Sequence, residues 1–510
     1  MFNSYLKYFC NYYMIFFEVK FNNLKKRIFF KASLTVFYII LIILSITFTD
    51  FGINSMYYSI YKRFINDNFF REDNLKCDKF DPIYLMGERF KKKSINICKS
   101  DESKHICFQT SKYNHYNKIA RNKYGVICKS ENFILDPSKS KQTNYIYKGP
   151  VDKITKGAPI LSKGFFNMKC KIQKNFRSYS SIYNNYFKSW NYNYENINED
   201  IKEFSPGKTV LLISRNQDSP NIYHGLSEII NVLGIMYFFD LKPENIQLLF
   251  LESMKLESDP FYDIYKNVIS GGEKPLYIRN LKQKYHISTA IHVPINWDSP
   301  VFIDLKIPKG YPDCKYPTKT YNIFNNLINK YLNISIFKDS FVSDKTIFYY
   351  PKSVIENFKL NKTFNKIITI QWRKVWPIGR KFQKRILGNG PELADQLSYI
   401  LPKNYLIRLV DTSSLSISEQ ISIMRQTDYL IGVHGAGLSL SIFMPSNAIL
   451  YEILPKKNIK VLVLMSALSG HKIYSDILKS NLKIINNNDI YFFDTIEFAK
   501  KSLRHIKENL

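Results

Sequence analysis

A stretch of 17 residues near the N-terminus, Ala32–Phe48, carries no charged side chain and consists mostly of large apolar residues. Roughly 17–25 such residues are needed for a helix to cross the hydrocarbon core of a bilayer, so the stretch predicts a transmembrane helix. A buried core helix is the alternative. A basic flank on one side only favours the membrane, and we expect an anchor at residues 32–53.

The basic residues set the orientation of this anchor. Basic side chains favour the cytosolic side of a membrane. The stretch is too long for the apolar core of a typical signal peptide, and no small-x-small cleavage pattern follows it, so we expect the anchor to be retained. The prediction is a type II topology, with a cytosolic tail at residues 1–31 and everything from about residue 54 in the lumen. The flanking basic residues are Lys20, Lys25, Lys26, Arg27 and Lys31.

The formal charge of +30, from 73 basic and 43 acidic residues, raises nucleic acid as a partner. A lumenal position argues against it. Lysine, asparagine, isoleucine, tyrosine and phenylalanine are all abundant, which indicates a general compositional bias rather than a basic groove. A nucleic-acid binder would need a cytosolic C-terminal part, so we expect no nucleic acid among the partners.

Six of the seven cysteines follow the predicted anchor and would lie in an oxidising compartment. None of them has C-x-x-C spacing, which favours disulfides over a zinc site, although six cysteines allow 15 pairings that the sequence does not resolve. Asn333 and Asn361 each begin an N-glycosylation acceptor triplet on the lumenal side. The six cysteines are Cys77, Cys98, Cys107, Cys128, Cys170 and Cys314.

The part beyond the anchor is long enough for two domains and a stem. Residues 54–205 are rich in lysine, asparagine, serine and tyrosine and predict a stem with a loop-rich cap. Residues 206–350 and 351–510 each alternate short apolar runs with helical periodicity, which is typical of βαβ units. We expect an α/β fold of the GT-B-like kind, with two Rossmann-like lobes and a cleft between them.

The pattern predicts individual elements in both lobes. Expected strands are Thr209–Ser214, Ile246–Leu251, Pro275–Ile278, Ile287–Val293, Lys366–Trp372, Tyr405–Val410, Tyr429–Val433 and Ile449–Leu454. Expected helices are Tyr223–Tyr237, Phe261–Val268, Tyr321–Tyr331, Pro391–Ile400, Ile417–Gln426, one from about Leu438, and Val461–Leu468. A capping-box spacing at Ser416 to Glu419 marks the start of one of them.

The sharpest chemical signal is the segment Asp428–Ile453, in which a buried strand is followed by His434, Gly435, Ala436 and Gly437. Such a turn can bring a ligand onto backbone N–H groups and the positive end of a helix. Its G-x-x-G-x-G order is neither the dinucleotide fingerprint nor a P-loop. The turn predicts a phosphate or nucleotide site, and the alternative is a tight turn with His434 as a hydrogen-bonding core residue.

This segment resembles the C-terminal signature of glycosyltransferase family 61. Pro220–Glu228 is similar to the family's N-x-Y-H-x-x-x-[DE] element, and Thr369–Gln383 is similar to its strand and loop with two arginines. Leu464–Tyr474 is similar to its L-A-x-x-x-G-x-x-Y tail. The resemblance implies transfer of a sugar, xylose or GlcNAc, from a UDP-sugar with inversion.

Arginine is rare in this chain, with 14 arginines against 59 lysines, yet Arg373, Arg380 and Arg385 fall within 13 residues. Planar, bidentate contacts to an anion favour arginine over lysine. We therefore expect Arg373 and Arg380 to bind the donor diphosphate, the alternative being a solvated basic loop. Glu452 ends the strand after the glycine turn and could accept hydrogen bonds from a ribose, or form a strand-end salt bridge.

His224 and Glu228 lie four residues apart and therefore on one face of the helix that opens the first lobe. Either could act as general base on an acceptor hydroxyl, and we favour Glu228. The alternative is a structural role at the start of the helix. No compact D-x-D motif and no H-E-x-x-H motif are present, which favours a mechanism without a metal or other cofactor.

Taken together, the sequence predicts a type II membrane glycosyltransferase of the Golgi or endoplasmic reticulum with a lumenal catalytic domain. Its partners would be a UDP-sugar donor and a glycan or glycoprotein acceptor. The alternative is a catalytically inactive, membrane-tethered glycan-binding protein of the same fold. The arginines, the glycine turn and Glu452 argue against that alternative.

The topology is tested by glycosylation. We expect endoglycosidase to shift the mobility of the expressed protein, and Asn333→Gln with Asn361→Gln to abolish the shift, because both triplets follow the anchor. Gel mobility and protease protection of microsomes measure this. An unshifted protein with a protease-accessible C-terminal part would contradict the lumenal assignment.

Overall fold

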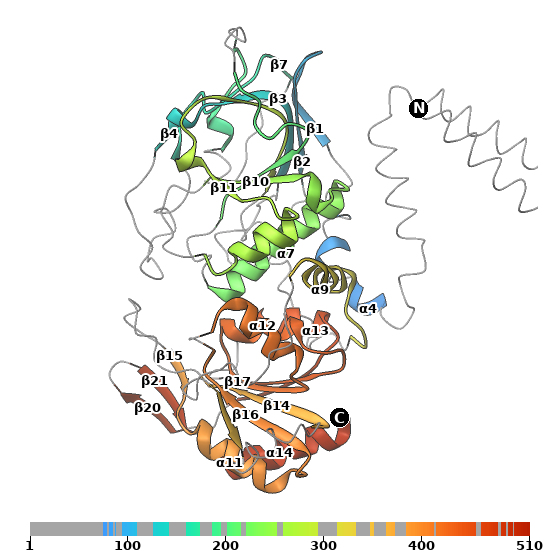
Figure 1. Ribbon diagram of the computed structural model, residues 1–510, viewed down its shortest axis with the longest axis vertical. Helices are drawn as coiled ribbons and strands as arrows, with labels where there is room; N and C mark the ends of the chain where they lie inside the picture. Colours follow the sequence, from blue (N-terminus) through green and yellow to red (C-terminus); the bar gives the residue numbers. More distant parts are fainter. Residues whose placement is uncertain are drawn as a thin grey trace, which may run out of the picture. The chain divides into compact units, whose positions relative to one another are not determined.

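The structure is a computed structural model (Figure 1), and the chain divides into the compact units Met1–Phe70 and Arg71–Leu510. The predicted anchor, Asn333 and Asn361 lie outside the described residues. Within the described part, no helix is both long and apolar enough to span a bilayer. The structure describes residues 75–78, 81–84, 87, 94–109, 126–141, 160–173, 186–194, 201–215, 221–251, 259–293, 314–332, 347–350, 364–372, 384–412, 415–454, 461–477, 481–485, 488–492 and 494–509.

The first sheet has ten strands. Its parallel part runs β11-β10-β9-β12, and β12 then pairs antiparallel with β3, from which β2, β1 and β7 continue the sheet. β6 pairs with β3 and with β8. The bounds are β1 Ser94–Lys99, β2 Lys104–Gln109, β3 Val126–Leu135, β6 Phe166–Asn167, β7 Lys171–Ile172, β8 Trp190–Asn191, β9 Thr209–Ile213, β10 Ile246–Phe250, β11 Leu276–Tyr277 and β12 Tyr285–Val293.

This sheet runs across the boundary that the sequence predicts at residue 205. β3 belongs to the expected cap and β12 to the expected first lobe, yet they are paired from Tyr285 opposite Leu135 to His292 opposite Cys128. The antiparallel pairing joins segments far apart in sequence, so local periodicity gives no sign of it. The expected stem and cap therefore contribute six of the ten strands of this sheet.

The second sheet has six strands in the order β13-β16-β14-β17-β18-β19. All its pairs are parallel except β13 with β16 at one edge. Both sheets carry helices, which gives the α/β class. The bounds are β13 Ile347–Tyr350, β14 Lys366–Gln371, β16 Tyr405–Val410, β17 Tyr429–Val433, β18 Ile449–Leu454, β19 Lys472–Ile477, α11 Gly390–Ile400, α12 Ile417–Arg425, α13 Val461–Leu468 and α14 Thr495–Asn509.

Smaller elements complete the described part. β15 (Lys384–Leu387), β21 (Asn488–Phe492) and β20 (Asn481–Ile485) form a three-stranded sheet, and β4 (Ser140–Lys141) pairs with β5 (Ile160–Leu161). Helix α4 covers Leu75–Asp78, and α9 covers Lys319–Tyr331. Short 3-10 turns are η3 Pro137–Lys139, η4 Pro243–Asn245 and η6 Ile278–Asn280.

The predicted strands over β16, β17 and β18 have the bounds that the structure gives, because their residues are mostly apolar and buried on both faces. The single charged residues within them are Arg408 in β16 and Glu452 in β18. The capping box is confirmed. Ser416 Oγ accepts a hydrogen bond from the Glu419 N–H, and the Glu419 carboxylate accepts one from the Ser416 N–H. The apolar runs and the capping box therefore predict the positions of these three strands and the start of α12.

Two expected α-helices have a different form. The segment after the glycine turn is the 3-10 helix η10, Ala436–Phe443, in which the Ser439 hydroxyl donates to the Ala436 carbonyl at 2.6 Å. The other is the π-helix η5, Ile264–Ile269, after which both the N–H and the hydroxyl of Ser270 donate to the Tyr265 carbonyl. Serine side chains that bond nearby carbonyls compete with the regular α-helical ladder.

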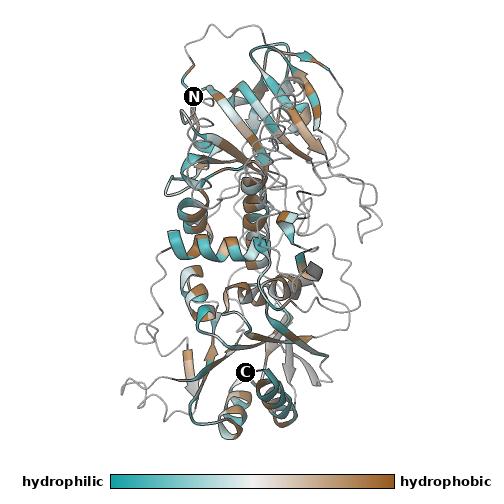
Figure 2. Cartoon of the chain, turned by 90° about the vertical axis from the view of Figure 1, so that its right-hand side faces the viewer, coloured by the Kyte–Doolittle hydropathy of each residue, from teal (hydrophilic) through white to brown (hydrophobic). Residues whose placement is uncertain are grey.

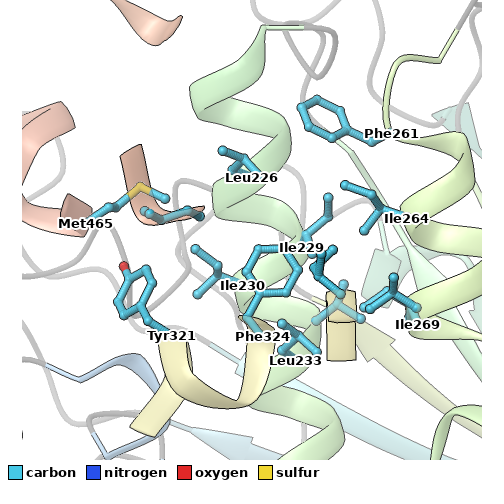
Figure 3. Packing of buried hydrophobic residues seen from close by; sticks show 14 of the residues in the cluster. Leu226, Ile229, Ile230, Leu233, Phe261, Ile264, Ile269, Tyr321, Phe324 and Met465 are labelled. Carbon is cyan, nitrogen blue, oxygen red and sulfur yellow. The ribbon is translucent and has the colours of Figure 1, made fainter. Parts of the chain in front are cut away.

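Helix α7, Ile222–Phe238, lies at the centre of the largest hydrophobic cluster. Figure 3 shows Leu226, Ile229, Ile230 and Leu233 of α7 between side chains of η5, α9 and α13. The same cluster contains η10 residues from the second sheet's side, and α7 packs directly against η10. One hydrophobic core therefore joins the two sheets.

In contrast, α14 mixes hydrophilic and hydrophobic residues in Figure 2, as expected for a helix with one buried face.

The cysteines form three disulfides, Cys77–Cys314, Cys98–Cys170 and Cys107–Cys128. The prediction of disulfides over zinc is confirmed. His105, Cys107 and Cys128 form a group of three potential metal ligands in the described part, but its two sulfur atoms are bonded to each other. Near Cys77, the Asp81 carboxylate accepts hydrogen bonds from the N–H and the hydroxyl of Thr320 at 2.8 and 2.7 Å, which fixes this segment to α9.

Three buried histidines predict that acid destabilises the fold. Desolvation lowers the pKa of His105 and His292 to about 3 and the pKa of His471 to about 4, from the usual 6.5. The unfolded chain therefore binds protons at a pH where the folded chain does not. Stability is intact above about pH 6.5 and is lost as the pH falls towards the folded pKa values, by about 1 kcal/mol per pH unit for each histidine.

Urea unfolding between pH 7 and pH 4 measures this loss. His471→Gln should reduce the slope of stability against pH, because one buried titrating group is removed. A free energy of unfolding that stays constant down to pH 4 would contradict the prediction.

Candidate functional site

The site is built at the carboxyl edge of the second sheet. β14, β16, β17 and β18 are parallel, so their carboxyl ends meet at one edge. Ligands of doubly wound sheets bind at this edge. His434 follows directly after β17, and the glycine turn connects it to η10.

A buried ion pair or hydrogen bond joins two of the predicted site residues. His434 Nδ1 lies 2.5 Å from Glu452 Oε1, with side chains only 2% and 0% exposed. The His434 N–H donates to the Ile453 carbonyl at 2.9 Å, which holds the histidine backbone beside β18. A contact at Nδ1 fixes the orientation of the ring and directs Nε2 away from the carboxylate.

The second carboxylate oxygen of Glu452 is also in use. Oε2 accepts a hydrogen bond from the Ser475 hydroxyl of β19 at 3.3 Å. Full burial and two internal hydrogen bonds favour a role for Glu452 in orienting His434. Its direct contact with a ribose, predicted from its place at the strand end, stays a prediction.

The glycine turn needs its small residues. A Cβ on Gly437 would lie 2.3 Å from Gln371 Nε2, and a Cβ on Gly432 would lie 2.7 Å from the Leu438 side chain. Gln371 ends β14 and donates from Nε2 to Thr412 Oγ1 at 3.1 Å. The Gln371 amide therefore packs across the turn. No sequence pattern singles out Gln371 at the end of β14 or Thr412 just beyond β16.

The helix with the predicted base is held by packing on several sides. The Asn221 side chain caps α7 by accepting from the Tyr223 N–H at 3.1 Å. Phe261 lies so close to Gly225 that a Cβ there would be 2.0 Å from its ring. Glu228 is 4% exposed, whereas His224 is half-buried. Because α7 packs against η10, the structure brings the helix of Glu228 against the segment that follows the glycine turn.

Other predicted site residues lie outside what the structure describes. Arg373 and Arg380 fall in undescribed residues, and only the backbone is described for Arg385 in β15. Their roles stay predictions.

Two further arginines, for which the sequence predicts no role, are buried. Arg215 forms an ion pair with Asp259 beyond the carboxyl end of β9, with its guanidinium 4.0 Å from the centre of the Phe250 ring. Arg408 of β16 donates to Thr369 Oγ1 at 2.9 Å and to Gln426 Oε1 at 3.0 Å. The rarity of arginine could have singled out both residues. Arg408 braces α12 against the sheet, since it also donates to the carbonyl of Ile423.

Comparison with protein families agrees with this geometry. Residues 282–451 match the family model described as glycosyltransferase 61. The chain contains a glycosyltransferase family 61 domain. The matched stretch begins just before β12 and ends in β18, so it includes the His434 turn. No curated protein matches the chain. The resemblance drawn from the sequence motifs is thus confirmed over this stretch, and it supports glycosyltransferase activity in general. The Pro220–Glu228 and Leu464–Tyr474 motifs lie outside the matched stretch.

The buried pair predicts a difference between two variants. Glu452→Gln replaces a charge-assisted hydrogen bond by a neutral one and should lower the free energy of unfolding by about 1 kcal/mol. Ser475→Ala removes only the longer bond to the other oxygen and should cost less. Urea unfolding measures both, and ¹⁵N spectra of His434 report its tautomer. If Glu452→Gln and Ser475→Ala lowered the free energy of unfolding equally and left the His434 spectrum unchanged, the His434–Glu452 contact would not be the stronger of the two.

Proposed function

We propose that the protein is a type II membrane glycosyltransferase of the endoplasmic reticulum or Golgi that transfers xylose or GlcNAc from a UDP-sugar to a glycan or glycoprotein hydroxyl with inversion. The observation that carries the proposal is the buried His434–Glu452 pair beside the glycine turn, at the ligand-binding edge of a parallel sheet. The two sheets with their shared core support a GT-B-like arrangement.

The donor would bind with its diphosphate at the glycine turn. Gly435 places no side chain between the backbone and the ligand, and the N-terminus of η10 offers backbone N–H groups. His434, held at Nδ1 by Glu452, would present Nε2 to the diphosphate. Arg373 and Arg380 would add bidentate contacts to the leaving phosphate oxygens. Glu452 is then a positioning residue that acts through His434.

The acceptor would be activated from α7. The burial of Glu228 favours it over His224, because a desolvated carboxylate binds a proton more readily and is a better base. The acceptor hydroxyl attacks the anomeric carbon as the bond to the UDP oxygen breaks, and Glu228 takes the hydroxyl proton. This single displacement inverts the anomeric configuration. UDP leaves as the anion that the arginines and the turn stabilise, without a metal ion.

A donor panel tests the proposal. The purified protein is incubated with UDP-xylose, UDP-GlcNAc or UDP-arabinose, with and without acceptor glycans, and the release of UDP is scored in the presence and absence of EDTA. We expect acceptor-dependent release from one donor that EDTA leaves largely intact. No release from any donor, together with glycan binding, would favour the catalytically inactive glycan-binding protein.

Two substitutions separate the donor and acceptor roles. Arg380→Lys keeps the charge but loses the paired hydrogen bonds, so donor affinity or turnover should fall roughly tenfold. Glu228→Gln should leave UDP binding near wild type and reduce transfer by roughly 10²–10⁴. Titration of UDP and transfer kinetics measure both. Normal transfer by Glu228→Gln would exclude Glu228 as the general base and favour His224 in that role.

A further inference from the structure

A cavity of about 300 Å³ lies in the N-terminal part of the first sheet, away from the glycine turn. It is formed by the turn between β1 and β2, by the end of β3, by β6 and by the start of β12. Its size is at the lower end of the range for ligand pockets, which suits a single small ring or a disaccharide end better than a nucleotide sugar.

The walls of the cavity are held by internal hydrogen bonds. Asn132 has a left-handed backbone with φ 54°, and its Nδ2 donates to the Glu102 carbonyl at 2.6 Å. Its own carbonyl accepts from the Ser103 hydroxyl at 2.8 Å. On the neighbouring strand β6, Asn167 Nδ2 donates to the Gly164 carbonyl at 2.6 Å, and the Cys98–Cys170 disulfide joins β1 to the segment after Met168. These hydrogen bonds and the disulfide fix the backbone around the cavity.

The chemistry of the lining is mixed. The lining includes the acidic residues Asp101 and Glu102, whose carboxylates accept hydrogen bonds, and the basic residue Lys169; all three residues are exposed. His286 and Tyr194 supply rings that can donate, accept or stack. In a chain of net charge +30, a cavity with two carboxylates against one lysine does not favour an anion. Acceptors, donors and a flat ring together suit a neutral ligand rich in hydroxyl groups.

The cavity is separate from the proposed donor edge. The proposed donor edge belongs to the second sheet, and none of the residues that line the cavity lies in that sheet or in the glycine turn. A sugar in the cavity could therefore not be the sugar undergoing transfer.

We infer that this cavity is a second carbohydrate-binding site, which holds a neutral sugar unit of the acceptor glycan or of a neighbouring glycan. Hydroxyl groups of the sugar donate to the Asp101 and Glu102 carboxylates, and Tyr194 packs against the face of the ring. The inference extends the proposed function, because an enzyme that acts on glycans gains affinity from a contact beyond the reacting unit. Binding at the cavity itself requires neither donor nor turnover.

Saturation-transfer difference NMR on the full chain in detergent, without nucleotide, tests the inference with xylobiose, chitobiose and cellobiose as probes. We expect ring-proton signals from at least one probe at a dissociation constant on the order of millimolar. Glu102→Gln should weaken binding roughly fivefold or more, because a charged acceptor is replaced by a neutral amide. Tyr194→Ala should have a similar effect.

The matched control is Glu131→Gln. Glu131 precedes Asn132 on β3 and pairs with Lys129 on the surface, but it does not line the cavity. Its replacement should leave sugar binding unchanged, and thermal melts check that each variant folds.

The inference is overturned if no probe binds, if Glu102→Gln and Tyr194→Ala bind sugars as the wild type does, or if inorganic phosphate displaces the sugar. Repeating the titration with Glu228→Gln keeps the result independent of catalysis. If Glu228→Gln still binds the sugar but does not transfer it, binding at the cavity does not depend on catalysis.

Discussion

The burial of α7 is the constraint on which the rest of the structure depends. A helix that is apolar on one face packs against one layer, but α7 is buried along most of its length and contacts η5, α9 and η10. Its side chains belong to the same hydrophobic cluster as those of η10. Burial of apolar surface is the main favourable term in folding. The two sheets are therefore joined mainly by the apolar contacts of α7, which carries the predicted base Glu228.

The buried polar groups of the candidate site are paired and hydrogen-bonded. A carboxylate that is 0% exposed is costly unless it is paired and hydrogen-bonded, and Glu452 is bonded to both His434 and Ser475. The pair fixes an imidazole at the end of a strand, beside a turn that has no room for a Cβ at Gly437. A rigid ring beside a turn of small residues is the type of preorganised site that stabilises a leaving anion.

The sequence predicts the strands β16, β17 and β18 of the second sheet well, because they are short, mostly apolar runs with turn residues at their ends. It also predicts His434 and Glu452 as site residues, but not their contact, which needs the register of β17 on β18. The pairing of β3 with β12 and the position of Gln371 depend on tertiary contacts alone. The forms of η5 and η10 depend on serine hydroxyl bonds, which periodicity does not reveal.

The central claim is that the donor nucleotide binds at the His434 turn. Calorimetric titration of UDP into the wild type and His434→Gln tests it most directly, with His505→Gln on α14 as the matched control. His434→Gln should raise the dissociation constant of UDP roughly tenfold or more, as expected for the loss of one charge-assisted hydrogen bond, while His505→Gln should leave it unchanged. An unchanged UDP affinity in a folded His434→Gln variant would contradict the account.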